Sequence, residues 1–325
     1  MPATYQWNAA DVGPHRDLLG DLQTADKDTV SPMTDRALRF GVYHSLLEFF
    51  HPLYMQDKAN NFTTHTFVDK PAAELYDLVQ RYEADLIWSD GAWEADSTYW
   101  NATDFLTWLV HNSTVKDHVV YNDRWGHDTK CRHGSFWTCQ DRYDPDALQA
   151  HKWENACTID QTSWEYNRDY LNVTSLVHTL VKVVALNGNL LLNIGPRADG
   201  TLDPIFVHRL TEMGDWLKVN GPAINSSQPW SVCQNETIKD KDDGSGAVDV
   251  YYASRDDIVY AILTSWPADN RLRLICPSAT NETNVRMLGV PTDNSETTVS
   301  WNEPMAMVGG LDIQLPNLTP NLVPC

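Results

Sequence analysis

The stretch DLIWSDGAWE, residues 85–94, predicts a buried strand that ends in an acid. The apolar residues at 86–88 suit a sheet interior, and Asp90 follows them between two small residues. A buried carboxylate is costly unless another group pairs with it or the protein uses it. Asp90 is therefore a candidate functional residue, held by a rigid strand beside Trp88.

The segments around this strand alternate between strand and helix patterns. Residues 39–50 (RFGVYHSLLEFF) begin as a strand, and residues 71–84 show the apolar spacing of an amphipathic helix with Pro71 in its first turn. Further helices are predicted over about 174–185 and 204–221, with strands at 118–122 and 189–196, the latter fully buried. This alternation predicts parallel βαβ units.

Polar residues follow three of the predicted strands. They are His44, Ser45 and Glu48 after the first, Asp90 after the second, and Asn122, Asp123 and Arg124 after the third. In a (β/α)8 barrel the active site lies at the carboxyl ends of the strands, and in a doubly wound sheet ligands bind at the same edge. Either topology therefore gathers these side chains at one edge.

The chain changes character near residue 228. From there to residue 325, alternating stretches such as AVDVYYASRDDIVYAILTSW are separated by turn-forming clusters. This pattern predicts a small antiparallel β-sandwich domain.

Composition restricts the partners and the compartment. A formal net charge of −20 argues against nucleic acid or an anionic membrane as a partner, and no apolar run is long enough for a transmembrane helix. The N-terminal stretch lacks the features of a signal peptide. Eight N-x-S/T sequons and six cysteines nevertheless indicate a secretory protein with disulfides. The thirteen tryptophans suit a core, or stacking on sugar rings.

No cofactor motif is present. The chain contains no G-x-S-x-G, H-E-x-x-H, Walker or G-x-G-x-x-G pattern. Cys131, His133, Cys139 and Cys157 have an irregular spacing, and in a secreted context this favours disulfides over zinc. We therefore expect neither a metal nor an organic cofactor.

Carboxylates among aromatic residues are typical of glycoside hydrolysis, which uses one ionised and one protonated carboxyl group. Asp90 on its strand suits the nucleophile, although a cap or turn aspartate would have the same sequence. Trp93 and Trp100 extend a candidate apolar wall beside it.

Six motifs in order along the chain resemble the α-L-fucosidases of glycoside hydrolase family 29, of the animal lysosomal or secreted kind. They are VGPHRDLL, FGVYHSLLEFFHPLY, LIWSDGAWE, YNDRWG, HKWE and NLLLNIGPRADGTLDPIF. The resemblance covers nearly the whole chain. It implies a retaining exo-glycosidase that removes terminal α-L-fucose from glycoproteins or glycolipids by double displacement, in the lysosome or outside the cell.

The resemblance also implies roles for individual residues. Asp90 matches the nucleophile, Trp88 a tryptophan lining the fucose pocket, Tyr43 a tyrosine near the sugar, and Arg124 an arginine at the pocket rim. For the general acid/base there are two candidates, Asp141, which is preferred, and Glu154.

Family members carry further βα units before the first matching motif. We therefore expect an α/β fold in which residues 1–227 form a partial (β/α)8-like (TIM-type) barrel and residues 228–325 the β-sandwich domain. Two alternatives remain open: a truncated, non-catalytic isoform or fucose-binding protein with an incomplete pocket, and a retaining glycosidase with another sugar preference. The expected partner is a fucosylated glycan, with no nucleic acid or membrane, and a homo-oligomer is compatible with the sequence.

Overall fold

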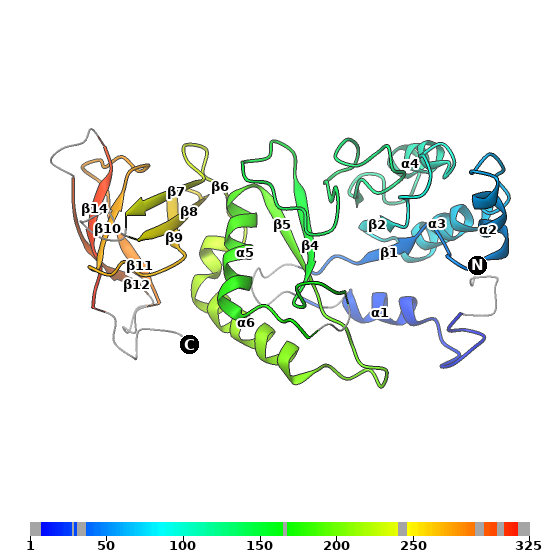
Figure 1. Cartoon of the computed structure of the whole chain (residues 1–325), viewed down its shortest axis with the longest axis horizontal. Helices are drawn as coiled ribbons and strands as arrows, with labels where there is room; N and C mark the ends of the chain where they lie inside the picture. The colour runs from blue at the N-terminus through cyan, green and yellow to red at the C-terminus, as the bar shows by residue number, and fades with distance from the viewer. Residues whose placement is uncertain are drawn as a thin grey trace. The chain divides into compact units, whose positions relative to one another are not determined.

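The structure, a computed structural model, forms two compact units (Figure 1). The first comprises residues up to Tyr143 together with His151–Trp153, and the second comprises Asp144–Ala150 and the chain from Glu154 on. The predicted boundary between residues 227 and 228 lies inside the second unit and stays a prediction. The residues described are 8–27, 29–30, 37–164, 168–239, 246–289, 296–303 and 309–317.

The first unit is built on a three-stranded parallel sheet in the order β1-β2-β3. Its strands are β1 (Gly41–Ser45), β2 (Leu86–Asp90) and β3 (Val120–Tyr121). Helix α3 (Asp69–Tyr82) connects the first two strands, and α4 (Ala102–His111) connects the second and third. The predicted parallel βαβ units are confirmed, and β3 is shorter than the predicted strand.

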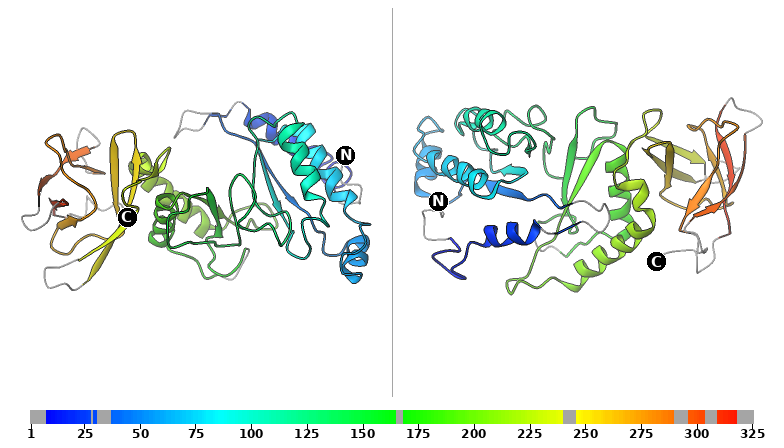
Figure 2. Two further views of the ribbon diagram at one scale, coloured as in Figure 1. Left: turned by 90° about the horizontal axis from the view of Figure 1, so that it is seen from above. Right: turned by 180° about the vertical axis from the view of Figure 1, so that it is seen from behind.

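The amphipathic pattern explains how α3 packs. Leu75 and Val79 of this helix are buried in the same core as Ile87 of β2. Tyr76 makes edge-on ring contacts with Phe105 and Trp108 of α4, so the two helices lie side by side, as Figure 2 shows from above. The predicted helix over 71–84 is thus confirmed, beginning two residues earlier.

Three helices of this unit were not predicted: α4, and the two shorter helices α1 and α2. In α1 (Leu18–Asp26), the Asp17 carboxylate caps the first turn by accepting from Gly20 N. In α2 (Pro52–Ala59), proline stands at the first position and His51 Nδ1 accepts from Leu53 N. Helices α1 and α2 are short and only weakly amphipathic, so a cap rather than an apolar face marks where each one starts.

The second unit opens with a βαβ segment. Strand β4 (Trp153–Thr158) pairs with β5 (Gly188–Asn193), with α5 (Val173–Ala185) between them in sequence. Most of β5 is only half-buried, so the prediction of a fully buried strand was wrong. In the described residues β5 pairs with β4 alone, whereas β4 also forms a bridge from Trp153 to Trp137 and is buried throughout.

Helix α6 (Pro204–Ile224) packs beside α5, where Phe206 is fully buried with Leu176. The helix was predicted to stop before Pro222, but it continues through it. Proline removes one hydrogen bond, and this loss is tolerated near a helix end when packing compensates. Here Ala223, which follows the proline, is 3% exposed.

The rest of the second unit is antiparallel, as predicted. One sheet contains β6 (Gln228–Pro229), β7 (Asn235–Lys239), β8 (Ala247–Arg255) and β9 (Ile258–Leu263). The other contains β10 (Arg271–Leu274), β13 (Ser300–Asn302) and β14 (Leu311–Gln314), and β11 (Arg286–Leu288) pairs with β12 (Glu296–Thr298).

Both sheets bury side chains in one common core, as expected of a sandwich: Val250 and Tyr252 from the first, Leu272 and Ile313 from the second. A disulfide joins Cys233 to Cys276, while Cys325 lies outside the described residues. None of the helices in the described ranges combines the length and the hydrophobicity needed to cross a bilayer.

Candidate active site

Asp90 ends β2 and is bound by two side chains. Tyr43 Oη donates to its Oδ2 over 2.8 Å, and Arg124 Nη1 donates to its Oδ1 over 3.1 Å. The Asp90 side chain is 19% exposed, so water reaches it without surrounding it. The carboxylate is therefore held in a fixed direction at the carboxyl edge of the parallel sheet.

The backbone around Asp90 fixes that direction. Leu46 N donates to the Asp90 carbonyl over 2.8 Å, which joins the segments that follow β1 and β2. Gly91 has a φ of +73°, and a Cβ there would lie 2.8 Å from Ser45 Oγ and 3.0 Å from Leu47 N. Glycine is thus required by conformation and by space, and it turns the chain directly after the acid.

Asn122 extends the sheet with its side chain. Regular pairing of β3 with β2 ends at Tyr121, but the Asn122 amide continues it. Its Oδ1 accepts from Ser89 N over 3.1 Å and its Nδ2 donates to Ser89 O over 2.8 Å. This pairing holds the backbone immediately before Asp90.

Trp88 is the centre of an aromatic and cationic stack. Tyr43 lies opposite it in the sheet register, with ring centroids 5.5 Å apart and nearly parallel planes. The Arg124 guanidinium carbon lies 4.8 Å from the Trp88 ring centroid. Trp88 thus supports both groups that bind Asp90.

The three nitrogens of the Arg124 guanidinium donate hydrogen bonds to three different residues. Besides Asp90, its Nε donates to Thr138 Oγ1 over 2.9 Å, and its Nη2 donates to Asp141 Oδ1 over 2.7 Å. Burial opposes the positive charge, but the two carboxylates outweigh it and raise the pKa of Arg124. The guanidinium therefore links the two acids as a permanent cation.

Tyr43 stays a hydrogen-bond donor. Although Tyr43 is 61% exposed, partial burial and the nearby Asp90 charge raise the pKa of its phenol above the ordinary value. The Tyr43 hydroxyl therefore keeps its proton and donates to the carboxylate.

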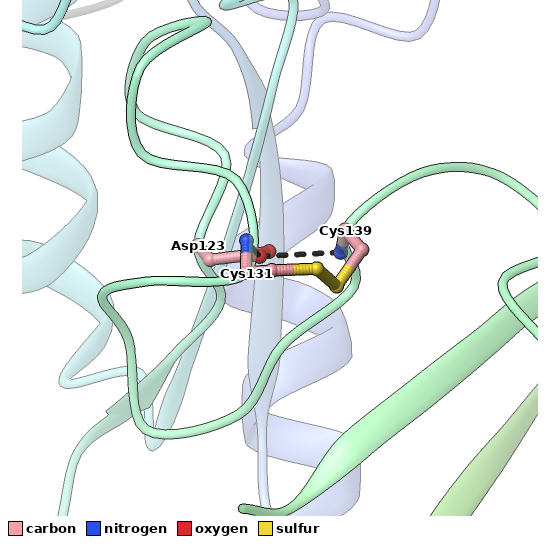
Figure 3. Close-up of side chains that lie close together, drawn as sticks. All are labelled: Asp123, Cys131 and Cys139. Carbon is pink, nitrogen blue, oxygen red and sulfur yellow. Dashed lines mark hydrogen bonds between the residues drawn. A yellow bond between two sulfur atoms is a disulfide. The ribbon is translucent and has the colours of Figure 1, made fainter. Parts of the chain in front are cut away.

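Figure 3 shows Asp123, Cys131 and Cys139, which together hold the loop that carries Thr138 and Asp141. Cys131 and Cys139 form a disulfide, a use of cysteine that was predicted without its pairing, and Asp123 is fully buried next to it. The Asp123 carboxylate accepts from Cys131 N over 2.6 Å, Cys139 N over 3.2 Å and Thr138 N over 2.8 Å. Although these three side chains offer close ligand atoms, the sulfurs are bonded to each other and the carboxylate is used by the loop.

The predicted site residues fall into two groups. Tyr43, Trp88, Asp90, Arg124 and Asp141 meet in the first unit through the contacts above. Glu154 belongs to the second unit, where it is 5% exposed and its Oε2 accepts from Asn189 Nδ2 over 2.9 Å.

Other residues that the sequence placed near the edge have different partners. His44 is buried and contacts Glu74 of α3 over 3.1 Å, and Glu48 forms an ion pair with Lys70. Trp93 is 46% exposed, whereas Trp100 is 5% exposed and packs in the core. Trp100 therefore does not contribute to an exposed apolar wall.

Thr138 is the contact of this cluster that sequence reasoning missed. Its hydroxyl accepts from Arg124 and donates to Asp123 over 2.8 Å. Both partners lie more than a dozen residues earlier in the chain, and no local pattern marks this threonine.

A cavity of about 760 Å³ lies in the second unit, lined mainly by residues 196–198 and 203–205 with Arg168 and Tyr170. It contains none of the predicted site residues. The predicted site residues are found instead in the cluster around Asp90.

The chain resembles known proteins over nearly all of its length. Residues 2–222 match the family described as Alpha-L-fucosidase, and residues 241–325 match the Alpha-L-fucosidase C-terminal domain. The tissue alpha-L-fucosidases of Bos taurus and Homo sapiens are 48% and 46% identical to it. These alignments cover 99% of this chain and 65% and 66% of those proteins, so the chain spans about two thirds of their length.

Solved structures of alpha-L-fucosidases are also similar to this chain. A structure of an alpha-L-fucosidase superposes with a TM-score of 0.72 at 28% identity, covering 95% of this chain and 65% of the other. The Thermotoga maritima alpha-fucosidase gives 0.70 at 28% identity, with 95% and 66% covered. With two matching family regions, a parallel βαβ sheet and an antiparallel C-terminal sandwich, the chain belongs to the alpha-L-fucosidase family.

Proposed function

We propose that this chain carries the catalytic carboxylates of a retaining α-L-fucosidase that removes terminal α-L-fucose from glycoproteins or glycolipids. The observation that carries the proposal is the bridge from Asp90 through Arg124 to Asp141. One guanidinium thereby binds two carboxyl groups of different exposure: the Asp90 side chain is 19% exposed and the Asp141 side chain 43%.

In the first step, Asp90 Oδ attacks the anomeric carbon of fucose while Asp141 gives a proton to the departing glycosidic oxygen. The bond to the leaving sugar breaks and a covalent fucosyl ester forms on Asp90. In the second step, Asp141 takes a proton from water, which attacks the same carbon and releases Asp90. The net configuration of the sugar is retained.

The environment of Asp90 supports the role of nucleophile. Its side chain is short, stands on a strand and receives hydrogen bonds from Tyr43 and Arg124. These donors hold the carboxylate in a single direction, which favours attack on one carbon.

The shared guanidinium supports retention. Retaining glycosidases keep their two carboxyl groups about 5–5.5 Å apart, and inverting ones about 6.5–9.5 Å. Asp90 and Asp141 bind the two terminal nitrogens of one planar group, which keeps them close together. This contact favours Asp141 over Glu154 as acid/base.

The covalent chemistry of the chain supports the proposed compartment. Two disulfides and the exposed asparagines of several sequons suit the lysosome or the extracellular space. The relatives include proteins named tissue and plasma alpha-L-fucosidases.

The test is to follow hydrolysis of an aryl α-L-fucoside by proton NMR with the purified chain. We expect the α-anomer of fucose to appear first and Asp90→Asn to lower turnover at least about 1000-fold. Asp117→Asn, at an exposed position in the turn between α4 and β3, serves as the control. The β-anomer appearing first, or full activity of Asp90→Asn, would overturn the mechanism. Faster hydrolysis of an α-galactoside than of the fucoside would indicate a different sugar preference. Fucose binding without turnover would indicate the non-catalytic alternative.

A further inference from the structure

Exposed aromatic side chains gather at one place in the molecule. In the ranges that the structure describes, they are Tyr43, Phe49, Phe50 and Trp93, with exposed fractions of 61%, 53%, 94% and 46%. Tyr43 stands in β1, and the others stand in the segments that follow β1 and β2. Phe49, Phe50 and Trp93 therefore lie beyond the strand ends, while Tyr43 lies within β1 and donates to Asp90.

Two of these rings form a pair. Phe49 and Trp93 have centroids 6.3 Å apart, with planes inclined by 46°. The hydrogen bond from Leu46 N to the Asp90 carbonyl and the close approach of Gly91 to Leu47 join the two segments that carry them. The pair is thus fixed to the backbone that positions Asp90.

The charges next to the pair are already neutralised. Glu48 forms an ion pair with Lys70, and Glu94 binds Lys58 over 2.7 Å. The aromatic faces therefore lie beside paired acids and present a surface suited to a neutral ligand with apolar C–H groups. A pyranose ring has such a face.

The length of the chain also limits how far Trp93 can lie from Asp90. Trp93 lies three residues after Asp90, and three residues of extended chain span at most about 10–11 Å. A sugar linked directly to a fucose at Asp90 extends over this range.

We propose that Phe49 and Trp93 form the binding site for the neutral sugar that carries the fucose, so that they select the leaving group. The inference rests on the proposed function, because it assigns the second subsite of the same reaction. Phe50, the most exposed of these rings, extends the surface toward the rest of the glycan.

The first experiment compares two substrates in Trp93→Ala, Phe49→Ala and the wild-type chain. One is 2′-fucosyllactose, which places galactose in the subsite, and the other is α-L-fucosyl fluoride, whose leaving group has no sugar. We expect kcat/KM for fucosyllactose to fall about five- to tenfold in each variant, and for the fluoride to stay within about twofold.

Two controls separate this effect from misfolding. Val232→Ala removes an exposed apolar side chain of the second unit and should change the hydrolysis of neither substrate. Trp93→Phe retains an aromatic face and should recover most of the fucosyllactose activity. Equal losses on both substrates in Trp93→Ala would overturn the inference and leave the fucosidase proposal standing.

The second experiment needs no turnover. Saturation-transfer NMR with N-acetyllactosamine, which lacks fucose, should show contacts of its C–H protons with the wild-type chain and with Asp90→Asn. We expect these contacts to be lost in Trp93→Ala and kept in Val232→Ala. Saturation transfer that persists in Trp93→Ala, or that is absent from the wild-type chain, would overturn the inference even if no fucoside is hydrolysed.

Discussion

Arg124 donates one hydrogen bond to Asp90 from Nη1 over 3.1 Å and another to Asp141 from Nη2 over 2.7 Å. The guanidinium binds both acids and thereby fixes one relative to the other. Planar geometry matters here, because the guanidinium presents its two terminal nitrogens in fixed directions, whereas a lysine ammonium is a rotatable point charge. Arg124 is accordingly a positioning residue for both steps of the proposed reaction.

Replacement of Arg124 by lysine keeps the charge and removes the fork. We expect kcat/KM for an aryl fucoside to fall about 10- to 100-fold, corresponding to about 1.5–3 kcal/mol for a charged hydrogen bond. The loss should be non-additive with Asp141→Asn, since both changes break one contact. Arg39→Lys, in the exposed ion pair with Asp85, should have no effect. Full additivity would show that Arg124 does not act through Asp141.

The acid/base assignment is tested by leaving-group dependence. Loss of a general acid harms poor leaving groups most, because good ones depart without a proton. We expect Asp141→Asn to lower kcat/KM about 100- to 1000-fold for 4-methylumbelliferyl fucoside, and far less for the 2,4-dinitrophenyl fucoside. The measurement is steady-state kinetics with both substrates.

Glu154→Gln is the matched comparison. Its carboxylate accepts from Asn189 and is buried, so we expect loss of about 1 kcal/mol in unfolding free energy and little change in kcat/KM. The reverse pattern, with leaving-group dependence in Glu154→Gln, would assign the acid to Glu154.

Asp57 anchors the segment between α2 and α3. Burial opposes its charge, but hydrogen bonds from Thr64, Thr66, the Phe67 amide and Tyr99 lower its pKa to about 2. Because the folded-state pKa lies below the usual value of 3.8, the ionised form stabilises the fold above pH 3.8, and this stabilisation disappears as the pH falls toward 2.

We therefore expect Asp57→Asn to lower the unfolding free energy by about 2–3 kcal/mol at pH 7, and the difference from wild type to shrink between about pH 4 and pH 2. Urea unfolding at a series of pH values measures it. Asp117→Asn is the exposed control. A difference that does not change with pH would show that the lost hydrogen bonds act independently of the charge.

The Cys131–Cys139 disulfide closes the loop that presents Thr138 and leads to Asp141. Its removal in Cys131→Ser/Cys139→Ser should cost about 2–3 kcal/mol of unfolding free energy and lower kcat, because the acid loses its fixed position. Cys233→Ser/Cys276→Ser opens the disulfide of the β-sandwich and should reduce stability alone. Equal effects of the two pairs on kcat would contradict a special role of the first.

Much of the local structure follows from the sequence. The apolar run 86–88 specifies β2, and the spacing of Leu75 and Val79 specifies α3, since burial requires these periods. Asp90 was recognisable because an acid directly after a hydrophobic strand needs a partner or a use. Short helices were missed where a cap, such as His51, rather than an apolar stripe defines them.

The tertiary structure alone decided which groups meet. Arg124 lies 34 residues from Asp90 and 17 from Asp141, and Thr138 completes its hydrogen bonds. No local period encodes such contacts, because they depend on the register of β1 with β2 and on where Asp123 holds the disulfide loop. The extension of α6 through Pro222 is also a tertiary feature, because Gly221 and Ala223 on either side of the proline are buried. Sequence thus determined the elements and the candidate acids, while packing over long separations determined their pairing.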